Sequence, residues 1–313
     1  MSENNLGLKV FAGSSNPELA AEIAAYLGVP LGRIELGRFS NGEIKLTVKE
    51  SVRGSDAFVV QSVCQPVNDN LMELLIIIDA LRRASAKRIT AVIPHYGYAR
   101  QDRKTKGREP ITAKLVANLL TVAGVDRILT VDLHAGQIQG FFDIPVDHLS
   151  AVRILADYFL AKQIENPVVV APDLGGVARA RDMAHLLKTS IAIVDKRRPE
   201  PGVAEVMNII GKVRGKTAVM IDDIIDTGGT ILEGAKAVLS KGATGVYVCC
   251  THPVFSGQAV KTLNESVVEE VVVANTIPVH ESGKIKVLSV ARLLGEAIRR
   301  IHQDLSVSEL FEE

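Results

Sequence analysis

The side chains best suited to chemistry in this sequence lie just after the apolar run 217–221. Three carboxylates come first, and a short loop of threonine and glycine follows them. The carboxylates are Asp222, Asp223 and Asp226, and the loop is Thr227, Gly228, Gly229 and Thr230. The residues that follow favour a helix, whose first backbone N–H groups and dipole attract an anion. Glycine lets the backbone approach a phosphate closely, and threonine hydroxyls add donors. The carboxylates would repel a bare phosphate but suit the hydroxyl groups of a sugar, with Mg²⁺ nearby. The pattern therefore predicts a site for a phosphorylated sugar, and the alternative is a surface turn capped by Asp226.

Two further segments could act on a phosphate group. The loop Pro172-Asp173-Leu174-Gly175-Gly176 follows the apolar run 168–171 and opens a predicted helix, in the same order of elements. Lys196 and Arg198 alternate after the run 191–194, so in an extended chain both would point to one side. Two such cations can stabilise charge that develops on a transferred diphosphate. An ordinary strand–helix turn and a solvated run of charges are the alternatives.

The first half of the chain carries side chains that could hold a nucleotide. Phe39 could stack on a purine while Asn41 and Glu43 bind its polar edge, although Asn41-Gly42 also fits the turn of a β-hairpin. Arg100 could neutralise triphosphate oxygens, with Gln101 on the base or ribose. The basic residues of this loop could alternatively form a nucleic-acid arm: Arg100, Arg103, Lys104, Lys106 and Arg108.

His134 follows the apolar run 127–131, where the active-site residues of a parallel sheet lie. Such a position suits a residue that faces a bound ligand. The alternative is a histidine that forms structural hydrogen bonds only.

These candidate sites require strands that end beside one another, and the rest of the pattern predicts them. Short β-branched runs alternate with helical segments, and strands that are apolar nearly throughout are typical of parallel strands covered on both faces. We therefore predict an α/β fold of two doubly wound domains with mainly parallel sheets, which binds ligands at the carboxyl ends of the strands. The predicted strands are Leu8–Ala12, Ala57–Ser62, Arg88–Ile93, Arg127–Val131, Pro167–Ala171, Ile191–Val194, Thr217–Ile221, Gly245–Cys250 and Val271–Ala274. The predicted helices are Pro17–Leu27, Asn70–Ala84, Thr112–Ala123, Ala151–Ala161, Gly176–Leu187, Ile231–Ser240 and Val290–His302.

The length of the chain predicts two domains, because 313 residues can build two ordinary cores. A new helix is predicted to start after Asp147–Ser150, so we expect an N-terminal domain at 1–148 and a C-terminal domain at 149–313. The last residues could pack back on the N-terminal domain.

Composition excludes several classes of protein. Lys and Arg together number 36, as do Asp and Glu, so net charge indicates neither nucleic acid nor a membrane as partner. The run Leu74–Ile78 is the longest apolar stretch and is far too short to span a bilayer. Three cysteines in apolar surroundings indicate reduced thiols, not a disulfide framework or a metal site. We expect a cytoplasmic protein.

Taken together, the quoted segments resemble two groups of enzymes. The segment from Asp222 to Thr230 resembles the phosphoribosyl-binding loop of the type I phosphoribosyltransferase fold. Adding the segments around Phe39, Arg100, Asp173 and Lys196, the chain resembles the ribose-phosphate diphosphokinases in order and spacing from about Phe11 to Phe311. The resemblance implies transfer of the β,γ-diphosphate of Mg²⁺–ATP to the anomeric hydroxyl of ribose 5-phosphate, in one in-line step for nucleotide biosynthesis.

The same resemblance implies roles for individual residues. Ribose 5-phosphate would bind the segment from Asp222 to Thr230, and ATP would bind Phe39, Asn41, Glu43, Arg100 and Gln101. His134 and Asp173 would hold Mg²⁺, and Lys196 and Arg198 would be catalytic.

A regulated class of this family forms hexamers and responds to phosphate and ADP at a site between subunits. The residues that resemble that site are Ser51, Arg53, Lys104, Arg108, Gln139, Asp147, Ser306, Ser308 and Phe311. For the last three, a frayed tail is the alternative. The resemblance therefore implies a homo-hexamer with phosphate and ADP as effectors.

Two other functions fit part of the pattern. A phosphoribosyltransferase acting on a base would share the loop at Asp226 but would need neither ATP nor the segment around Lys196. A catalytically silent regulatory homologue is expected to have lost catalytic residues, whereas Lys196, Arg198, His134 and Asp173 are all present.

Overall fold

The structure is a computed structural model that describes residues 7–197 and 206–312, and it divides into two units. Unit 1 contains the chain up to Ser150, the short segment Thr276–Pro278 and the chain from Ser289 onward. Unit 2 contains Ala151–Asn275 and Val279–Leu288. The chain therefore passes between the units more than once, and its C-terminal helix belongs to unit 1.

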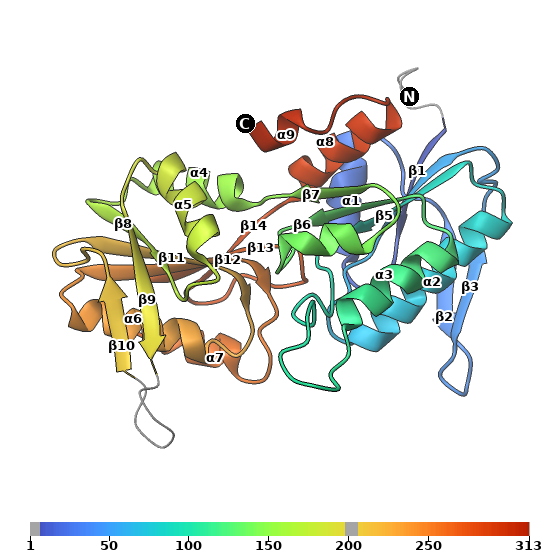
Figure 1. Ribbon diagram of the computed structural model, residues 1–313. Coiled ribbons are helices and arrows are strands. Elements are labelled where there is room, and N and C mark those ends of the chain that lie inside the picture. Colours follow the sequence, from blue (N-terminus) through green and yellow to red (C-terminus); the bar gives the residue numbers. More distant parts are fainter. Residues whose placement is uncertain (1–6, 198–205, 313) are drawn as a thin grey trace. The chain divides into compact units, whose positions relative to one another are not determined.

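The core of unit 1 is a parallel sheet in the order β1-β4-β5-β6-β7 (Figure 1). Its strands are β1 (Leu8–Ala12), β4 (Asp56–Val60), β5 (Arg88–Ile93), β6 (Arg127–Val131) and β7 (Val146–Leu149). A separate antiparallel hairpin joins β2 (Ile34–Arg38) and β3 (Ile44–Val48). The helical segments are α1 (Pro17–Leu27), α2 (Val67–Arg83), α3 (Thr112–Ala123), η2 (Gly136–Phe141), α8 (Ala291–His302) and α9 (Glu309–Glu312).

Helices cover both faces of the unit 1 sheet because its strands are apolar on both sides. Ala57 and Val59 of β4 belong to one core cluster with Leu74 of α2 and Leu120 of α3. The side chain of Phe58 points to the other face and is also fully buried. A sheet buried on both faces leaves its strand ends as the exposed, polar places where ligands can bind.

Unit 2 is built on a sheet in the order β10-β9-β8-β11-β12-β13-β14, parallel except for the pair β10–β9. Its strands are β8 (Pro167–Ala171), β9 (Ile191–Arg197), β10 (Val206–Ile210), β11 (Thr217–Ile225), β12 (Gly245–Pro253), β13 (Glu270–Ala274) and β14 (Ile285–Leu288). Its helices are α4 (Val152–Lys162), α5 (Val177–Leu186), α6 (Gly229–Ser240) and α7 (Ala259–Asn264).

Alternation along β8 shows how the apolar strands of unit 2 are used. Val168 and Val170 lie in a core cluster with residues of α6, whereas Val169 and Ala171 lie in a second cluster with residues of α4 and α5. The predicted α/β fold with mainly parallel sheets is confirmed. All the predicted strands and helices are present. Six of them have the predicted bounds to the residue: Leu8–Ala12, Pro17–Leu27, Arg88–Ile93, Thr112–Ala123, Arg127–Val131 and Pro167–Ala171.

The structure also contains elements that were not predicted. Short strands at the sheet edges and a 3-10 helix were missed, including β7, β10, β14 and η2. Strand β9 continues to Arg197, past the expected end at Val194, so Lys196 lies within a strand. The register partner of Lys196 on β10 is Met207. Arg198 lies outside the described residues.

Candidate active site

The junction between the end of β11 and the start of α6, called the cradle below, is the predicted site for a phosphorylated sugar in unit 2. The strand carries Asp222 and Asp223 to the carboxyl edge of the sheet, and α6 begins at Gly229 after a short turn. Gly228 is the N-cap of α6, with φ +82°, so no side-chain oxygen caps the helix and its first N–H groups point toward the loop. A side chain at Gly228 would be strained at this φ, and its Cβ would lie 3.4 Å from Leu263. The local sequence therefore forms the strand–loop–helix junction that its glycines predicted, and its binding of a phosphate stays a prediction.

The two neighbouring carboxylates of β11 share one arginine. Arg179 of α5 places an Nη1 atom 3.3 Å from Asp223 Oδ1 and 3.6 Å from Asp222 Oδ1. The side chains are 16% exposed for Arg179, 6% for Asp223 and 22% for Asp222, so water screens the group weakly. Burial, and then the neighbouring Asp223 carboxylate, raise the pKa of Asp222 above its ordinary value, although Arg179 opposes the rise. Two neighbouring carboxylates at a strand end suit hydroxyl donors or a cation.

Arg179 is a candidate site residue that the sequence reasoning did not assign. Its helix was recognised as the one opened by the second glycine loop, and Arg179 stands three residues after Gly176, in the first turn. An arginine in that position faces the neighbouring strand end, and this signal could have identified it.

The second glycine loop lies beside the cradle. Strand β8 pairs with β11 in parallel, so Asp173, which follows β8, stands at the same edge as Asp222. Asp173 is exposed, and its Oδ1 accepts a hydrogen bond of 3.0 Å from the backbone N–H of Gly176. Strand β9 is the next neighbour, and Lys196 lies near its carboxyl end. Unit 2 therefore brings three of the predicted segments to one edge of its sheet, on adjacent strands.

Unit 1 gathers a second set of predicted residues at the carboxyl edge of its own sheet. Arg100 and Gln101 lie in the loop after β5, and His134 follows β6, the neighbouring strand. Gln101 accepts a short hydrogen bond from the Thr112 hydroxyl, and its carbonyl accepts one of 3.2 Å from the Ala113 N–H, which ties the loop to the start of α3. His134 and Gln101 are both exposed.

The predicted purine-binding residues form the turn of the β2–β3 hairpin. Phe39 is 51% exposed, and Lys45 Nζ lies 5.8 Å from the centre of its ring. Asn41 Oδ1 accepts a hydrogen bond of 3.2 Å from the Glu43 N–H, and Gly42 has φ +90°. The hairpin turn and the nucleotide site are thus compatible, because the turn holds an aromatic face in solvent. Arg38 ties the hairpin to α2 by an ion pair of 3.2 Å with Asp69.

The two residues predicted to hold Mg²⁺ belong to different units, His134 to unit 1 and Asp173 to unit 2. Within residues 7–197 and 206–312, no group of three or more His, Cys, Asp or Glu side chains is arranged to hold a metal ion. Mg²⁺ differs from zinc in that it keeps several waters and often takes only one or two carboxylates together with substrate phosphates. The oxygen donors of Asp173 and of the acid pair on β11 fit that mode of binding.

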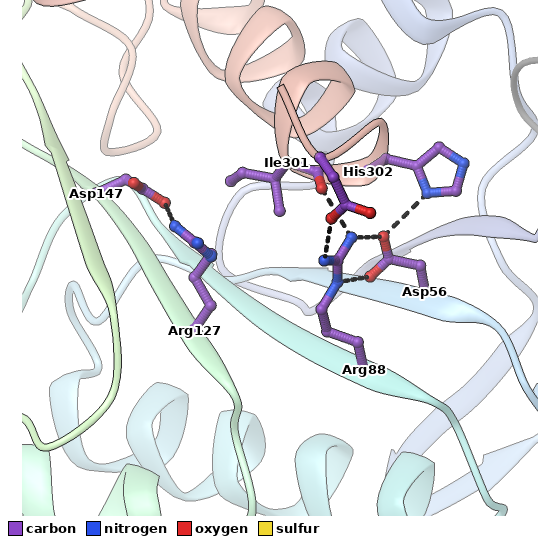
Figure 2. A network of polar contacts seen from close by, with 7 residues as sticks. Asp56, Arg88, Arg127, Asp147, Ile301 and His302 are labelled. Carbon is purple, nitrogen blue, oxygen red and sulfur yellow. Dashed lines mark hydrogen bonds and ion pairs between the residues drawn. The ribbon is translucent and has the colours of Figure 1, made fainter. Parts of the chain in front are cut away.

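Some of the residues predicted to bind effectors lie near the amino ends of the unit 1 strands and in the tail after α8. Figure 2 shows how α8 is fastened there: Arg88 donates to both oxygens of Asp56, at 2.9 and 2.5 Å, and to the Ile301 carbonyl at 2.8 Å. His302 Nδ1 lies 2.9 Å from Asp56 Oδ2, and Arg88 also pairs with Asp304 at 3.0 Å. The network fixes the point from which the tail leaves the helix.

The tail itself is held by a second arginine. Arg300 donates to the Ser306 carbonyl at 2.9 Å and to Glu309 at 2.5 Å, while Glu296 accepts from it at 2.8 Å. Ser306 and Ser308 are exposed. The tail ends in the short helix α9, and the side chain of Phe311 lies outside the description.

The remaining predicted effector residues divide into two groups. Ser51 and Arg53 are exposed just before β4, whereas Lys104 and Arg108 are exposed in the loop after β5. Asp147 of β7 accepts a hydrogen bond of 2.7 Å from Arg127, the first residue of β6, as Figure 2 shows.

Comparisons with known proteins match the chain along nearly its whole length. Residues 8–124 match the family described as the N-terminal domain of ribose phosphate pyrophosphokinase, and residues 196–312 match the phosphoribosyl synthetase-associated domain. The chain is 60% identical over 311 residues to a ribose-phosphate pyrophosphokinase of Clostridium tetani, with 97% of each chain covered. It is 59% identical to the protein of the same name from Bacillus subtilis, again with 97% of each covered. The crystal structure of a phosphoribosylpyrophosphate synthetase from Mycobacterium smegmatis superposes with a TM-score of 0.91 at 46% identity, covering 95% of this chain and 99% of that one.

Proposed function

Because the chain belongs to the ribose-phosphate pyrophosphokinase family, we propose that it transfers the β,γ-diphosphate of Mg²⁺–ATP to the anomeric hydroxyl of ribose 5-phosphate. The products are 5-phosphoribosyl 1-diphosphate and AMP. The 5-phosphoribosyl 1-diphosphate supplies nucleotide biosynthesis. The observation that carries the proposal is the unit 2 sheet edge, where adjacent strands present an uncapped helix start, an acid pair and Lys196.

The cradle on β11 and α6 is the proposed site for ribose 5-phosphate. The 5-phosphate accepts hydrogen bonds from the first N–H groups of α6 and from Thr227 and Thr230. Asp222 and Asp223, which lie beside Arg179, accept hydrogen bonds from the ribose hydroxyls. Asp226, Gly228 and Gly229 complete the loop.

ATP is proposed to bind the unit 1 residues. Its purine stacks on Phe39 with Asn41 and Glu43 at its edge, while Arg100 and Gln101 contact phosphate and ribose. The anomeric oxygen forms a bond to the β-phosphorus as the bond from that phosphorus to the α,β-bridging oxygen breaks, and AMP leaves. Lys196 and Arg198 are the proposed catalytic cations that stabilise charge on the moving diphosphate.

Mg²⁺ is proposed to neutralise the phosphate oxygens of ATP, with His134 and Asp173 as its protein contacts. The other residues position and neutralise the substrates, and no side chain of the described site is a nucleophile. Positioning and electrostatics therefore carry the rate.

Regulation by phosphate and ADP is proposed to require more than one copy of the chain. Arg53 and the tail lie at the amino edge of the unit 1 sheet. Lys104 lies in the loop that follows the carboxyl end of β5. A hydrogen bond of 2.9 Å from Gln137 to Asp102 holds that loop on the carboxyl side of the sheet. The six residues of β5 span about 20 Å, which is farther than one diphosphate reaches. An effector that touches both groups would therefore lie between subunits.

An apolar stripe on α3 supports assembly into a homo-hexamer. Ile111, Leu115, Leu119 and Val122 follow one another at helical spacing and are 37%, 54%, 39% and 79% exposed. Clusters of this kind on a surface mark protein contacts. Leu115→Glu should lower the mass measured by light scattering after size exclusion, whereas Leu115→Met, which keeps an apolar side chain, serves as the control.

The proposed location is the cytoplasm. Cys64, Cys249 and Cys250 are buried and free, as reduced thiols are in that compartment. Across the described ranges, no helix is long and apolar enough to cross a bilayer.

AMP release from Mg²⁺–ATP, with and without ribose 5-phosphate, tests the proposed function. We expect sugar-dependent AMP that falls by at least about a hundredfold in Lys196→Ala, whereas Lys212→Ala, an exposed lysine outside the site, keeps the wild-type rate. Absence of AMP from folded wild-type protein with phosphate supplied would favour a silent homologue. Sugar-independent AMP would refute coupled transfer.

A further inference from the structure

We propose that His148 is a positioning residue that links Gln139, a proposed effector residue, to the loop that carries His134. The inference rests on the roles proposed above for those two residues. It concerns unit 1 alone, where β7, η2 and the end of β6 meet.

One ring nitrogen of His148 holds the backbone next to His134. The N–H of Leu133 donates to His148 Nε2 at 2.8 Å, and Leu133 is 5% exposed. A backbone N–H can only donate, so Nε2 must offer its lone pair, and the proton of the neutral ring stands on Nδ1. His148 therefore fixes the residue directly before His134 through a bond that requires one tautomer.

The two residues that follow His148, Leu149 and Ser150, hold Asp132, which precedes Leu133. Asp132 is buried and has φ +37°, a backbone conformation that is costly for a residue other than glycine. Its N–H donates to the Leu149 carbonyl at 2.9 Å, and its Oδ1 accepts from the Ser150 hydroxyl at 2.9 Å. Three consecutive residues at the end of β7 thus hold the two residues that lead to the exposed His134.

The other ring nitrogen of His148 faces Gln139. Gln139 Nε2 lies 3.3 Å from His148 Nδ1 and also donates to the Gly136 carbonyl at 2.9 Å. With the proton on Nδ1, two donors face each other. A half-turn of the amide would present its oxygen to Nδ1–H, but Gly136 would then lose this donor. The two arrangements compete, so a ligand that binds the amide of Gln139 selects one of them.

Asp147, a second proposed effector residue, directly precedes His148 in β7. The side chain of Asp147 is 13% exposed and is held by Arg127 at 2.7 Å (Figure 2). An anion that competes for Arg127 would release Asp147 and shift β7, on which His148 stands. Both effector residues therefore reach the Leu133–His134 segment through His148.

Replacement of His148 by two amides separates positioning from bulk. In His148→Gln the side-chain oxygen reaches the place of Nε2 and can accept from Leu133, whereas in His148→Asn it reaches only the place of Nδ1. We expect His148→Gln to keep the wild-type kcat within about twofold and His148→Asn to lower it about five- to tenfold. Hydrogen exchange of the peptide containing Leu133, a readout that needs no activity, should rise in His148→Asn alone. Equal behaviour of the two variants in exchange and in kcat would overturn the positioning role.

A double-mutant cycle tests the link to Gln139. Gln139→Ala should change the response to phosphate and ADP in the wild-type background and add no further change in His148→Asn. Asp143→Ala, an exposed residue just after the same 3-10 helix, is the matched control and should leave that response unchanged. Additive effects of Gln139→Ala and His148→Asn would overturn the link. A wild type that forms AMP but ignores both effectors would instead refute the proposed regulation, and a wild type that forms none would refute the proposed reaction.

Discussion

Removal of the arginine that serves two carboxylates should destabilise the protein in a pH-dependent way. Arg179 lies 3.3 Å from Asp223 and 3.6 Å from Asp222, and all three side chains are less than a quarter exposed. Loss of one partner from a buried ion pair costs about 3–5 kcal/mol. In Arg179→Met the acid pair can take up a proton instead, so we expect the lower end, about 3 kcal/mol, at pH 8.5.

The sign of the pH dependence follows from the raised pKa of Asp222. An unfolded aspartate titrates near pH 4, so above that pH the folded protein binds more protons than the unfolded chain, and stability falls as pH rises toward the folded pKa. Without Arg179 the pKa of Asp222 rises further, so the fall in stability extends to higher pH. The loss in Arg179→Met should therefore shrink to about 1 kcal/mol at pH 5.5, where Asp222 is largely protonated.

Calorimetry at pH 5.5 and 8.5 measures the effect. A loss of about 3 kcal/mol corresponds to a decrease of roughly 10 °C in the midpoint of unit 2. Arg181→Met is the matched control, because Arg181 is exposed two residues farther along α5. Equal losses in the two variants, or a loss in Arg179→Met that does not change with pH, would refute the electrostatic reasoning.

Three further predictions follow from single side chains. Gly228→Ala should raise the KM for ribose 5-phosphate and lower stability by about 1–2 kcal/mol, because its φ is +82°; an unchanged KM in kinetic assays would contradict the cradle. Phe39→Ala should raise the KM for ATP about tenfold while leaving that for ribose 5-phosphate unchanged, since stacking on a base is worth about 1–3 kcal/mol. Arg299 and Arg300 lower the pKa of Glu296 to about 2, so its contribution is present above pH 4.5 and is lost as pH falls toward 2. Glu296→Gln should therefore lower the thermal midpoint at pH 7, and a difference from the wild type that failed to shrink below pH 4.5 would argue against this ion pair.

The sequence predicted the central elements well because local signals and tertiary burial agree there. Pro17–Leu27 begins with an Asn16 cap and proline in its first turn and ends at Gly28, and the structure has the same bounds. The geometry of the loop between β11 and α6 was also predictable, since glycine and threonine at a strand–helix junction define it locally.

Other features depend on contacts between distant segments, which periodicity does not report. Arg88 starts an apolar strand and gave no sign that it would bind Asp56 and the Ile301 carbonyl of the last long helix. Arg179 was read only as part of a helix, because its two carboxylates come from a strand more than 40 residues later. The roles of Lys196 and the other predicted site residues remain predictions.

Phosphorus NMR of the products tests the proposed reaction most directly. With Mg²⁺–ATP and ribose 5-phosphate, we predict equal amounts of AMP and a sugar that carries a diphosphate at its anomeric carbon, with no free diphosphate. Formation of ADP and a sugar bisphosphate would show attack at the γ-phosphorus and would contradict the proposal, as would the absence of any new phosphorus signal from the folded protein.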